Sequence, residues 1–112
     1  MARSVRPIVA ADGAGFSISD VSVPGQLDAS LCYKHHTEAN IVLEGEGTVE
    51  DVATGEVHQL KPGDIYLVFP NERHRIRIEG GMRVISIFNP PLVGPETHDA
   101  DGSFPPAIEV VQ

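Results

Sequence analysis

The residues best suited to chemistry are an acid and several histidines placed beside β-prone segments. Glu38 follows the pair His35–His36 and precedes an apolar run, whereas a glutamate within a strand usually lies on a solvated face. His74 comes directly after the turn that begins at Pro70, at the start of an alternating segment. Carboxylate and imidazole groups bind iron, manganese or zinc, and an imidazole also titrates near neutral pH. These positions indicate a metal-binding or proton-transferring site.

Short β-strands must position these side chains. From residue 29 onward, β-prone runs alternate with turn residues at short intervals, which is typical of an antiparallel sandwich or barrel, and no helical periodicity is sustained. Hairpin turns or barrel corners are expected where glycine and proline gather, at residues 44–47, 54–55, 61–64, 70–72 and 80–81. The predicted strands are residues 16–21, 29–33, 38–43, 47–52, 57–60, 65–69, 74–78 and 82–88.

Length and charge narrow the class of protein. The 112 residues suit one domain over 1–112, with the proline-containing segment 89–112 as a C-terminal tail or flap that closes the barrel mouth. A net charge of -8 without a basic block disfavours nucleic acid and membrane partners. No apolar run is long enough for a membrane span or a secretory signal, and the single Cys32 reads as a small apolar filler, so a cytoplasmic protein is expected.

Two patches of the sequence resemble those of cupins, small β-barrels that commonly hold a metal. Glu38 stands seven residues before Gly45, as the cupin glutamate does, and residues 61–74 resemble the second cupin patch with its Pro-x-Gly turn and later histidine. The first patch departs from the general pattern, because positions 31 and 33, where histidines are expected, hold Leu31 and Tyr33. An ordinary three-histidine site cannot be assembled.

The absence of histidines at positions 31 and 33 points to one subfamily of the cupins. Four blocks in order, residues 33–39, 44–47, 61–66 and 88–92, followed by Glu96 and His98, resemble the ectoine synthases over residues 33–106. The resemblance implies an all-β cupin double-stranded β-helix and a hydro-lyase that closes N-γ-acetyl-2,4-diaminobutyrate, or a related N-acyl diamino acid, to a cyclic amidine with loss of water. It also implies a small-molecule substrate.

The resemblance also implies the roles of individual residues. The metal would be Fe(II), with zinc or manganese as possible substitutes, and oxygen-rich donors with one imidazole suit all three. His35 and His58 are expected at the surface. The implied metal ligands are Glu38, Tyr66 and His74; the implied catalytic residues are Tyr33, His36, Glu96 and His98; and the implied substrate contacts are Phe88 and Tyr33.

Other functions remain open at this stage. A cupin isomerase, lyase or dioxygenase acting on another small acid would use the same fold, and a non-catalytic cupin could bind or store a small molecule. The chain also lacks an aromatic N-terminal region of typical ectoine synthases and has Ile41 where they carry tyrosine, so the substrate could differ. Exposed edge strands predict a homodimer.

Overall fold

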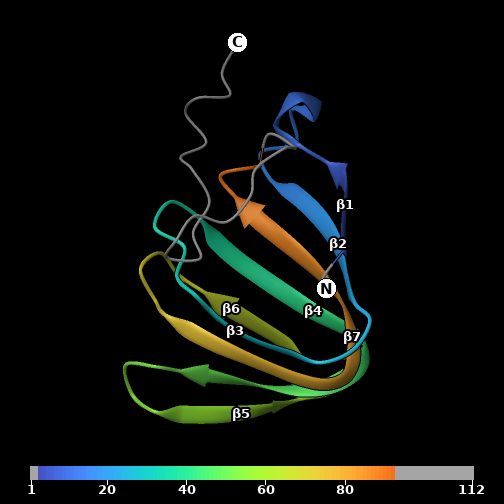
Figure 1. Cartoon of the computed structure of the whole chain (residues 1–112). Coiled ribbons are helices and arrows are strands. Elements are labelled where there is room, and N and C mark those ends of the chain that lie inside the picture. The colour runs from blue at the N-terminus through green and yellow to red at the C-terminus, as the bar shows by residue number, and fades with distance from the viewer. Residues whose placement is uncertain (1–2, 93–112) are drawn as a thin grey trace.

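Antiparallel strands roll into an open barrel in this computed structural model, which describes residues 3–92 (Figure 1). No helix in that part of the chain is long and apolar enough to cross a membrane. The elements are β1 (Arg3–Ile8), the 3-10 turn η1 (Ala10–Asp12), β2 (Ser17–Val23), β3 (Leu27–Leu31), β4 (Thr37–Asp51), β5 (Glu56–Leu60), β6 (Ile65–Val68) and β7 (His74–Asn89).

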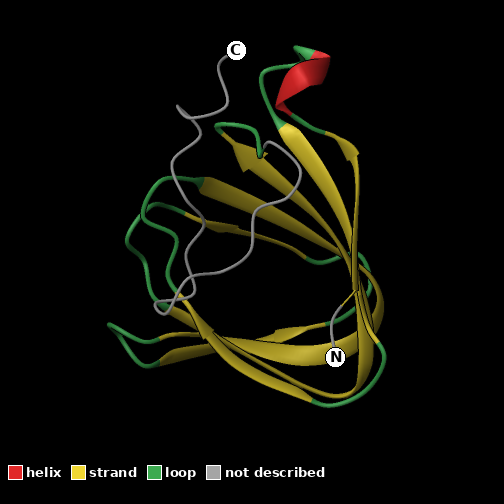
Figure 2. Cartoon of the chain, turned by 45° about the horizontal axis from the view of Figure 1, so that its top comes forward, coloured by secondary structure: helices red, strands yellow, loops and turns green. Residues whose placement is uncertain are grey.

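The strands form one seven-stranded sheet, which the bends of the two long strands, β4 and β7, divide into two layers, here called the first and second sheets. The first part of β4 pairs with β6 on one side and with the second part of β7 on the other. The second part of β7 also pairs with β2, and β2 pairs with β1. This set is the first sheet. The second sheet contains β3, the first part of β7, the second part of β4, and β5. Figure 2 shows the strands curving around a common interior, and the predicted all-β cupin class is confirmed.

Glycines make the corner where β4 and β7 pass together from one sheet to the other. Gly45 has φ +85°, and a Cβ added there would overlap the carbonyl oxygen of Gly81. A Cβ at Gly47 would lie 2.6 Å from the carbonyl oxygen of Arg77. Segments 44–47 and 80–81 are therefore barrel corners rather than hairpins, and the separately predicted segments 38–43 and 47–52 form one strand, as do 74–78 and 82–88.

One strand was not predicted. β1 contains Pro7, a residue that favours strands poorly. As an edge strand it pairs only with β2 among the described elements, and a proline is tolerated where its missing N–H faces away from a partner. The other strands begin and end within two residues of prediction, or merge at the corner.

Two apolar clusters fill the interior. The larger, here called the corner cluster, surrounds the glycine corner. The smaller, the mouth cluster, lies at the opposite end of β7, where the Leu92 amide donates to Ser17 Oγ at 2.7 Å and the Leu92 carbonyl accepts from the Ala10 amide. The corner cluster contains Val23, Val42, Val49, Leu60, Ile76, Ile78, Met82 and Val84; the mouth cluster contains Tyr33, Phe88 and Leu92.

Candidate active site

Strand alternation turns every second residue of the first sheet toward the interior. Glu38 of β4 pairs with Phe88 of β7 and with Val68 of β6. Asn40, two residues further along β4, pairs with Tyr66 of β6. Directly paired residues of an antiparallel sheet face the same side, so Glu38 and Tyr66 lie on neighbouring rungs of one inner face.

His74 reaches the same interior from the second sheet. It begins β7, opposite Leu31, and its Nε2 lies 3.8 Å from Oε1 of Glu38. Both side chains are buried. The Nδ1 atom lies 3.3 Å from the carbonyl oxygen of Glu72, so Nδ1 carries the proton of a neutral ring and Nε2 presents its lone pair to Glu38. A backbone carbonyl thus orients the ring toward a site shared by both sheets.

Burial favours the neutral form of each of the three predicted ligands. Desolvation raises the pKa of Glu38 to about 7, an effect that the neighbouring Asn40 amide opposes. Burial also lowers the pKa of His74, against the raising influence of the Glu72 carbonyl. Desolvation, followed by the charge of Glu38, raises the pKa of the Tyr66 hydroxyl far above its ordinary value. A bound cation would reverse the cost of ionising the carboxylate.

The donor set fits a divalent metal. Glu38, Tyr66 and His74 offer a carboxylate, a phenol oxygen and an imidazole nitrogen, which suit a hard or borderline cation. Among residues 3–92, no three His, Cys, Asp or Glu side chains come together to hold an ion, so Tyr66 is needed to complete such a set.

Aromatic rings form one wall beside this set. The Tyr33 ring lies 5.3 Å from the Phe88 ring in an edge-to-face arrangement and 6.0 Å from the His74 ring. His36 is fully buried and packs edge-to-face against Phe88 at 5.9 Å. It does not line the interior cavity, whereas Tyr33 and Phe88 do.

A cavity of about 450 Å³ brings five of the predicted residues together, namely Tyr33, Glu38, Tyr66, His74 and Phe88. The predicted catalytic residues Glu96 and His98, and the tail after residue 92, lie outside the described residues. Ile41 does not line the cavity. Its neighbours Asn40 and Val42 are the inward, buried residues, so the replacement of tyrosine by Ile41 changes the opposite face of the strand.

Sequence reasoning missed five polar residues of the cavity, Ser4, Arg6, Ser19, Asn40 and Ser86. Isolated polar residues within a strand usually lie on its solvated face, and only the pairing register shows that Ser19, Asn40 and Ser86 face inward. Asn40 follows Glu38 at the spacing of strand alternation, which is the one signal that could have identified it.

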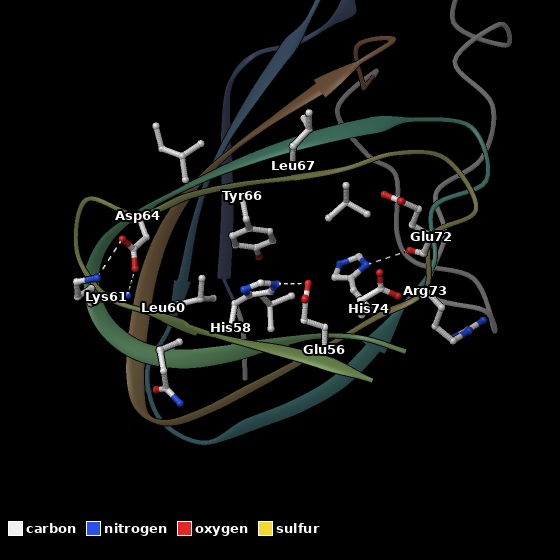
Figure 3. A pocket seen from close by; sticks show the side chains of 15 residues that line it. Glu56, His58, Leu60, Lys61, Asp64, Tyr66, Leu67, Glu72, Arg73 and His74 are labelled. Atoms are coloured by element: carbon white, nitrogen blue, oxygen red, sulfur yellow. Dashed lines mark hydrogen bonds and ion pairs between the residues drawn. The ribbon is translucent and has the colours of Figure 1, made fainter. Parts of the chain in front are cut away.

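A second hollow, of about 510 Å³, lies between β5 and β6 and shares Tyr66 and His74 with the cavity (Figure 3). His58 and Glu56 project into it from β5, with His58 Nε2 2.9 Å from Glu56 Oε1. Both are exposed, and the expectation of surface positions holds for His58 and His35. Cys32 is buried, as expected of an apolar filler.

Sequence comparisons show the family to which this chain belongs. The sequence model of the family described as ectoine synthase matches residues 1–108. An L-ectoine synthase of Mycolicibacterium vanbaalenii is 44% identical over 96% of this chain and 82% of its own length. Another, from Oceanobacillus iheyensis, is 46% identical over 92% of this chain and 80% of its own length.

Solved structures show the same fold. The crystal structure of an ectoine synthase from P. lautus superposes with a TM-score of 0.78 at 38% identity, covering 83% of this chain and 67% of that one. An ethanolamine utilization protein Q from Salmonella typhimurium has a TM-score of 0.66 at 19% identity, covering 80% of this chain and 70% of that one, and this likeness shows the fold alone.

Proposed function

We propose that this chain closes N-γ-acetyl-2,4-diaminobutyrate to a cyclic amidine and releases water. The chain belongs to the ectoine synthase family and is a hydro-lyase of that type. One divalent metal, Fe(II) by preference, would assist the reaction. The observation that carries the proposal is the approach of Glu38 and His74 to 3.8 Å, in a cavity that Tyr66 also lines.

Glu38, Tyr66 and His74 would hold the metal, which when bound supplies a Lewis acid that polarises the acetamide carbonyl. The Glu72 carbonyl keeps the His74 ring in the tautomer that leaves Nε2 available as a ligand. Tyr33 and Phe88 form a wall of two rings against which the short aliphatic chain of the substrate can pack. Since the attack is intramolecular, holding the amine against the carbonyl lowers much of the barrier.

Proton transfer must accompany ring closure, because the attacking amine loses protons and the carbonyl oxygen leaves as water. Burial raises the pKa of the Tyr33 hydroxyl far above its ordinary value, so the group stays a neutral donor at the cavity wall. That position suits it to donate a hydrogen bond to the departing oxygen. His36 lies behind Phe88, where it supports the ring. Glu96 and His98, from the tail, remain predicted catalytic residues.

Metal analysis tests the proposal. Protein purified without oxygen is expected to bind about one divalent ion per chain, and Glu38→Ala or His74→Ala should abolish binding. The matched control is Glu56→Ala, which removes an exposed carboxylate from the second hollow and should leave metal content unchanged. Stoichiometric metal in both site variants would refute the ligand assignment. Turnover of acetylated diaminobutyrate separates this reaction from those of other cupins.

We also propose that the protein is a cytoplasmic homodimer. Ile65, Leu67 and Phe69, on and just beyond β6, leave 68%, 53% and 52% of their surface exposed. A second copy packed over this edge would bury them. The lone Cys32, which has no partner for an internal disulfide, supports a reducing compartment. Light scattering at micromolar concentration is expected to give twice the chain mass, and the mass of one chain would exclude the dimer.

A further inference from the structure

The second hollow reaches the candidate metal site from outside the cavity. Tyr66 and His74, two of the three predicted ligands, are the only described residues that line both the hollow and the cavity. The side chain of His74 is 5% exposed, and its Nε2 lies 3.8 Å from Glu38 Oε1, which is too far for a hydrogen bond. The lone pair of Nε2 is therefore available to an ion, and the hollow ends at two ligand side chains.

Two acidic side chains lead across the hollow to His74. Asp51 of β4 pairs with His74 of β7 on one side and with Glu56 of β5 on the other. Paired residues face the same side of a sheet, so Glu56 and Asp51, here called the acidic row, share the inner face with His74. Because neighbouring strands lie about 5 Å apart, the row covers the roughly 10 Å between the open edge at β5 and His74.

The two approaches to Tyr66 and His74 differ in charge. The charged residues of the cavity are Glu38 and Arg6, whose formal charges cancel. The hollow has a formal charge of -2, because its lining includes four carboxylates and two cationic side chains. These are Asp51, Glu56, Asp64 and Glu72, and Lys61 and Arg73. A cleft of one charge sign concentrates ions of the opposite sign and raises their association rates by roughly 10- to 1,000-fold.

The two cationic side chains do not block the acidic row. Lys61 Nζ lies 3.4 Å from Asp64 Oδ1, so its charge is largely offset by its neighbour. Arg73 donates to Ser30 Oγ at 3.0 Å, and Figure 3 shows its side chain pointing away from the hollow. The negative charge of the hollow is therefore concentrated on the side that leads to His74.

The acidic row is suited to passing an ion on rather than holding it. At the entrance, the side chains of Glu56 and His58 are 68% and 60% exposed, and they lie 2.9 Å apart. In the part of the chain that the structure describes, no three His, Cys, Asp or Glu side chains are close enough together to hold a metal ion. One or two exposed ligands exchange quickly with water, so an ion would stop there only briefly.

We propose that divalent ions enter and leave the metal site through the second hollow, along the acidic row from Glu56 past Asp51 to His74. The inference rests on the proposed function, which places a metal at Glu38, Tyr66 and His74. An ion on this path meets Tyr66 and His74 first and Glu38 last, because Glu38 lines only the cavity. The cavity is then left to the substrate, and the two reach the site by different ways.

Rates of metal binding test the route, because a passage changes rates in both directions and leaves affinity nearly unchanged. Metal-free protein is mixed with Co²⁺, whose visible absorption reports its coordination, and dissociation is followed in excess chelator. Asp51→Asn and Glu56→Gln remove the charges but keep oxygens for the Ala53 amide and for His58. Each should slow association and dissociation about threefold, and the double variant about tenfold. The dissociation constant should change less than about threefold in 0.15 M salt, which screens a charge about 10 Å away.

Glu50→Gln is the matched control. Glu50 precedes Asp51 on β4 but faces the opposite side of the sheet, where it pairs with Val57 and Arg75. The variant removes the same charge from the outer face, so both rates should stay within about 1.5-fold of the wild-type values. Glu56→Lys places a cation at the entrance and should slow both rates more than Glu56→Gln does.

The outcomes separate the route from the metal site and from the reaction. Wild-type rates in the double variant, or equal slowing by Glu50→Gln and Asp51→Asn, would overturn the route and keep the site. A dissociation constant raised more than about tenfold by Asp51→Asn would make Asp51 part of the metal site and would also overturn the route. Slowing by the acidic row alone, without turnover of acetylated diaminobutyrate, would keep the route and refute the proposed reaction. Failure of the wild-type protein to bind Co²⁺ would refute both route and metal site.

Discussion

The two ends of the barrel are built on opposite physical principles. Around the glycine corner the inward residues are aliphatic, and backbones approach so closely that Gly45 and Gly47 have no room for a side chain. Toward the mouth, the same two strands turn Glu38, Asn40, His74 and Ser86 inward. Apolar burial stabilises the corner at about 25 cal/mol per Å². At the mouth, buried polar groups without partners cost free energy.

The difference indicates where stability and activity reside. A corner residue should affect unfolding strongly and chemistry only through the fold. A mouth residue should affect binding and turnover, and removing it can leave the fold as stable as before or more so. Variants at the two ends should therefore fall into separate groups when unfolding and turnover are measured together.

The largest effect is expected at the corner. Gly45→Ala introduces a Cβ that overlaps the carbonyl oxygen of Gly81, at a residue with φ +85°. We expect a loss of more than about 3 kcal/mol in the free energy of unfolding, measured by urea titration, or failure to fold. Gly55→Ala is the control, because its φ is +77° and nothing lies within 4 Å of the added Cβ. It should cost about 1 kcal/mol, and equal effects would contradict the close approach.

The next effect concerns pH in the metal-free protein. The pKa of Glu38 is raised by burial from 4.5 to about 7, so both the folded and unfolded chains are protonated there below pH 4.5. As pH rises from 4.5 to 7 the unfolded chain loses its proton first, and stability falls by at most about 3 kcal/mol. The lowered pKa of His74 acts in the opposite direction as the pH rises toward 6.5, its ordinary value.

Glu38→Gln isolates this contribution. The difference in unfolding free energy between the variant and the wild-type protein should grow in favour of the variant from pH 5 to pH 8, because glutamine does not titrate. Urea unfolding in the presence of a chelator measures it. A difference that is the same at both pH values would mean that the carboxyl of Glu38 is solvated.

The tail provides a test at the mouth. Removing residues 94–112 should leave the fold and the metal content intact and lower turnover about a hundredfold, the scale of losing substrate positioning and one proton-transfer group. Full turnover would remove Glu96 and His98 from the site. The cut must spare Leu92, which is 0% exposed. Cutting from residue 90 should additionally cost about 2–4 kcal/mol of unfolding free energy, seen by urea titration.

The smallest effect is expected in the second hollow. The side chain of His58 is 60% exposed and pairs with the exposed Glu56. His58→Ala should change the free energy of unfolding by less than about 0.5 kcal/mol and leave metal content unchanged. Leu60→Ala, two residues along the same face but 4% exposed, should cost about 2–4 kcal/mol. A large effect of His58→Ala on metal content would extend the metal site into this hollow.

Much of the fold could be predicted from alternation and turn residues, since each predicted strand lies within or overlaps an observed one. The sequence could not show that 44–47 is a corner, because glycine serves hairpins and close strand crossings equally; the choice depends on Gly81, distant in the chain. β1 was not predicted because Pro7 disfavours a strand. The proline is tolerated there because β1 is an edge strand that pairs with β2.

Some residues of the candidate site could likewise be predicted from the sequence, and others could not. Glu38, Tyr66 and His74, which line the cavity, could be predicted to belong to the site because their spacing resembles that of a family. Ser19 and Asn40 were missed because a single polar residue in a strand carries no sign of which face it occupies until the register is known. Residues defined by motif could be found from the sequence, and residues defined by register required the structure.

The placement of Glu38 in one sheet and His74 in the other has a thermodynamic consequence. An ion bound between them would join two layers of the folded barrel, so it would bind the folded chain and not the unfolded one. At a free concentration one hundred times its dissociation constant, such an ion would add about 2.7 kcal/mol to the free energy of unfolding. The concentration of free metal in the cell would then determine the fraction of this protein that stays folded at high temperature, as well as its rate of turnover.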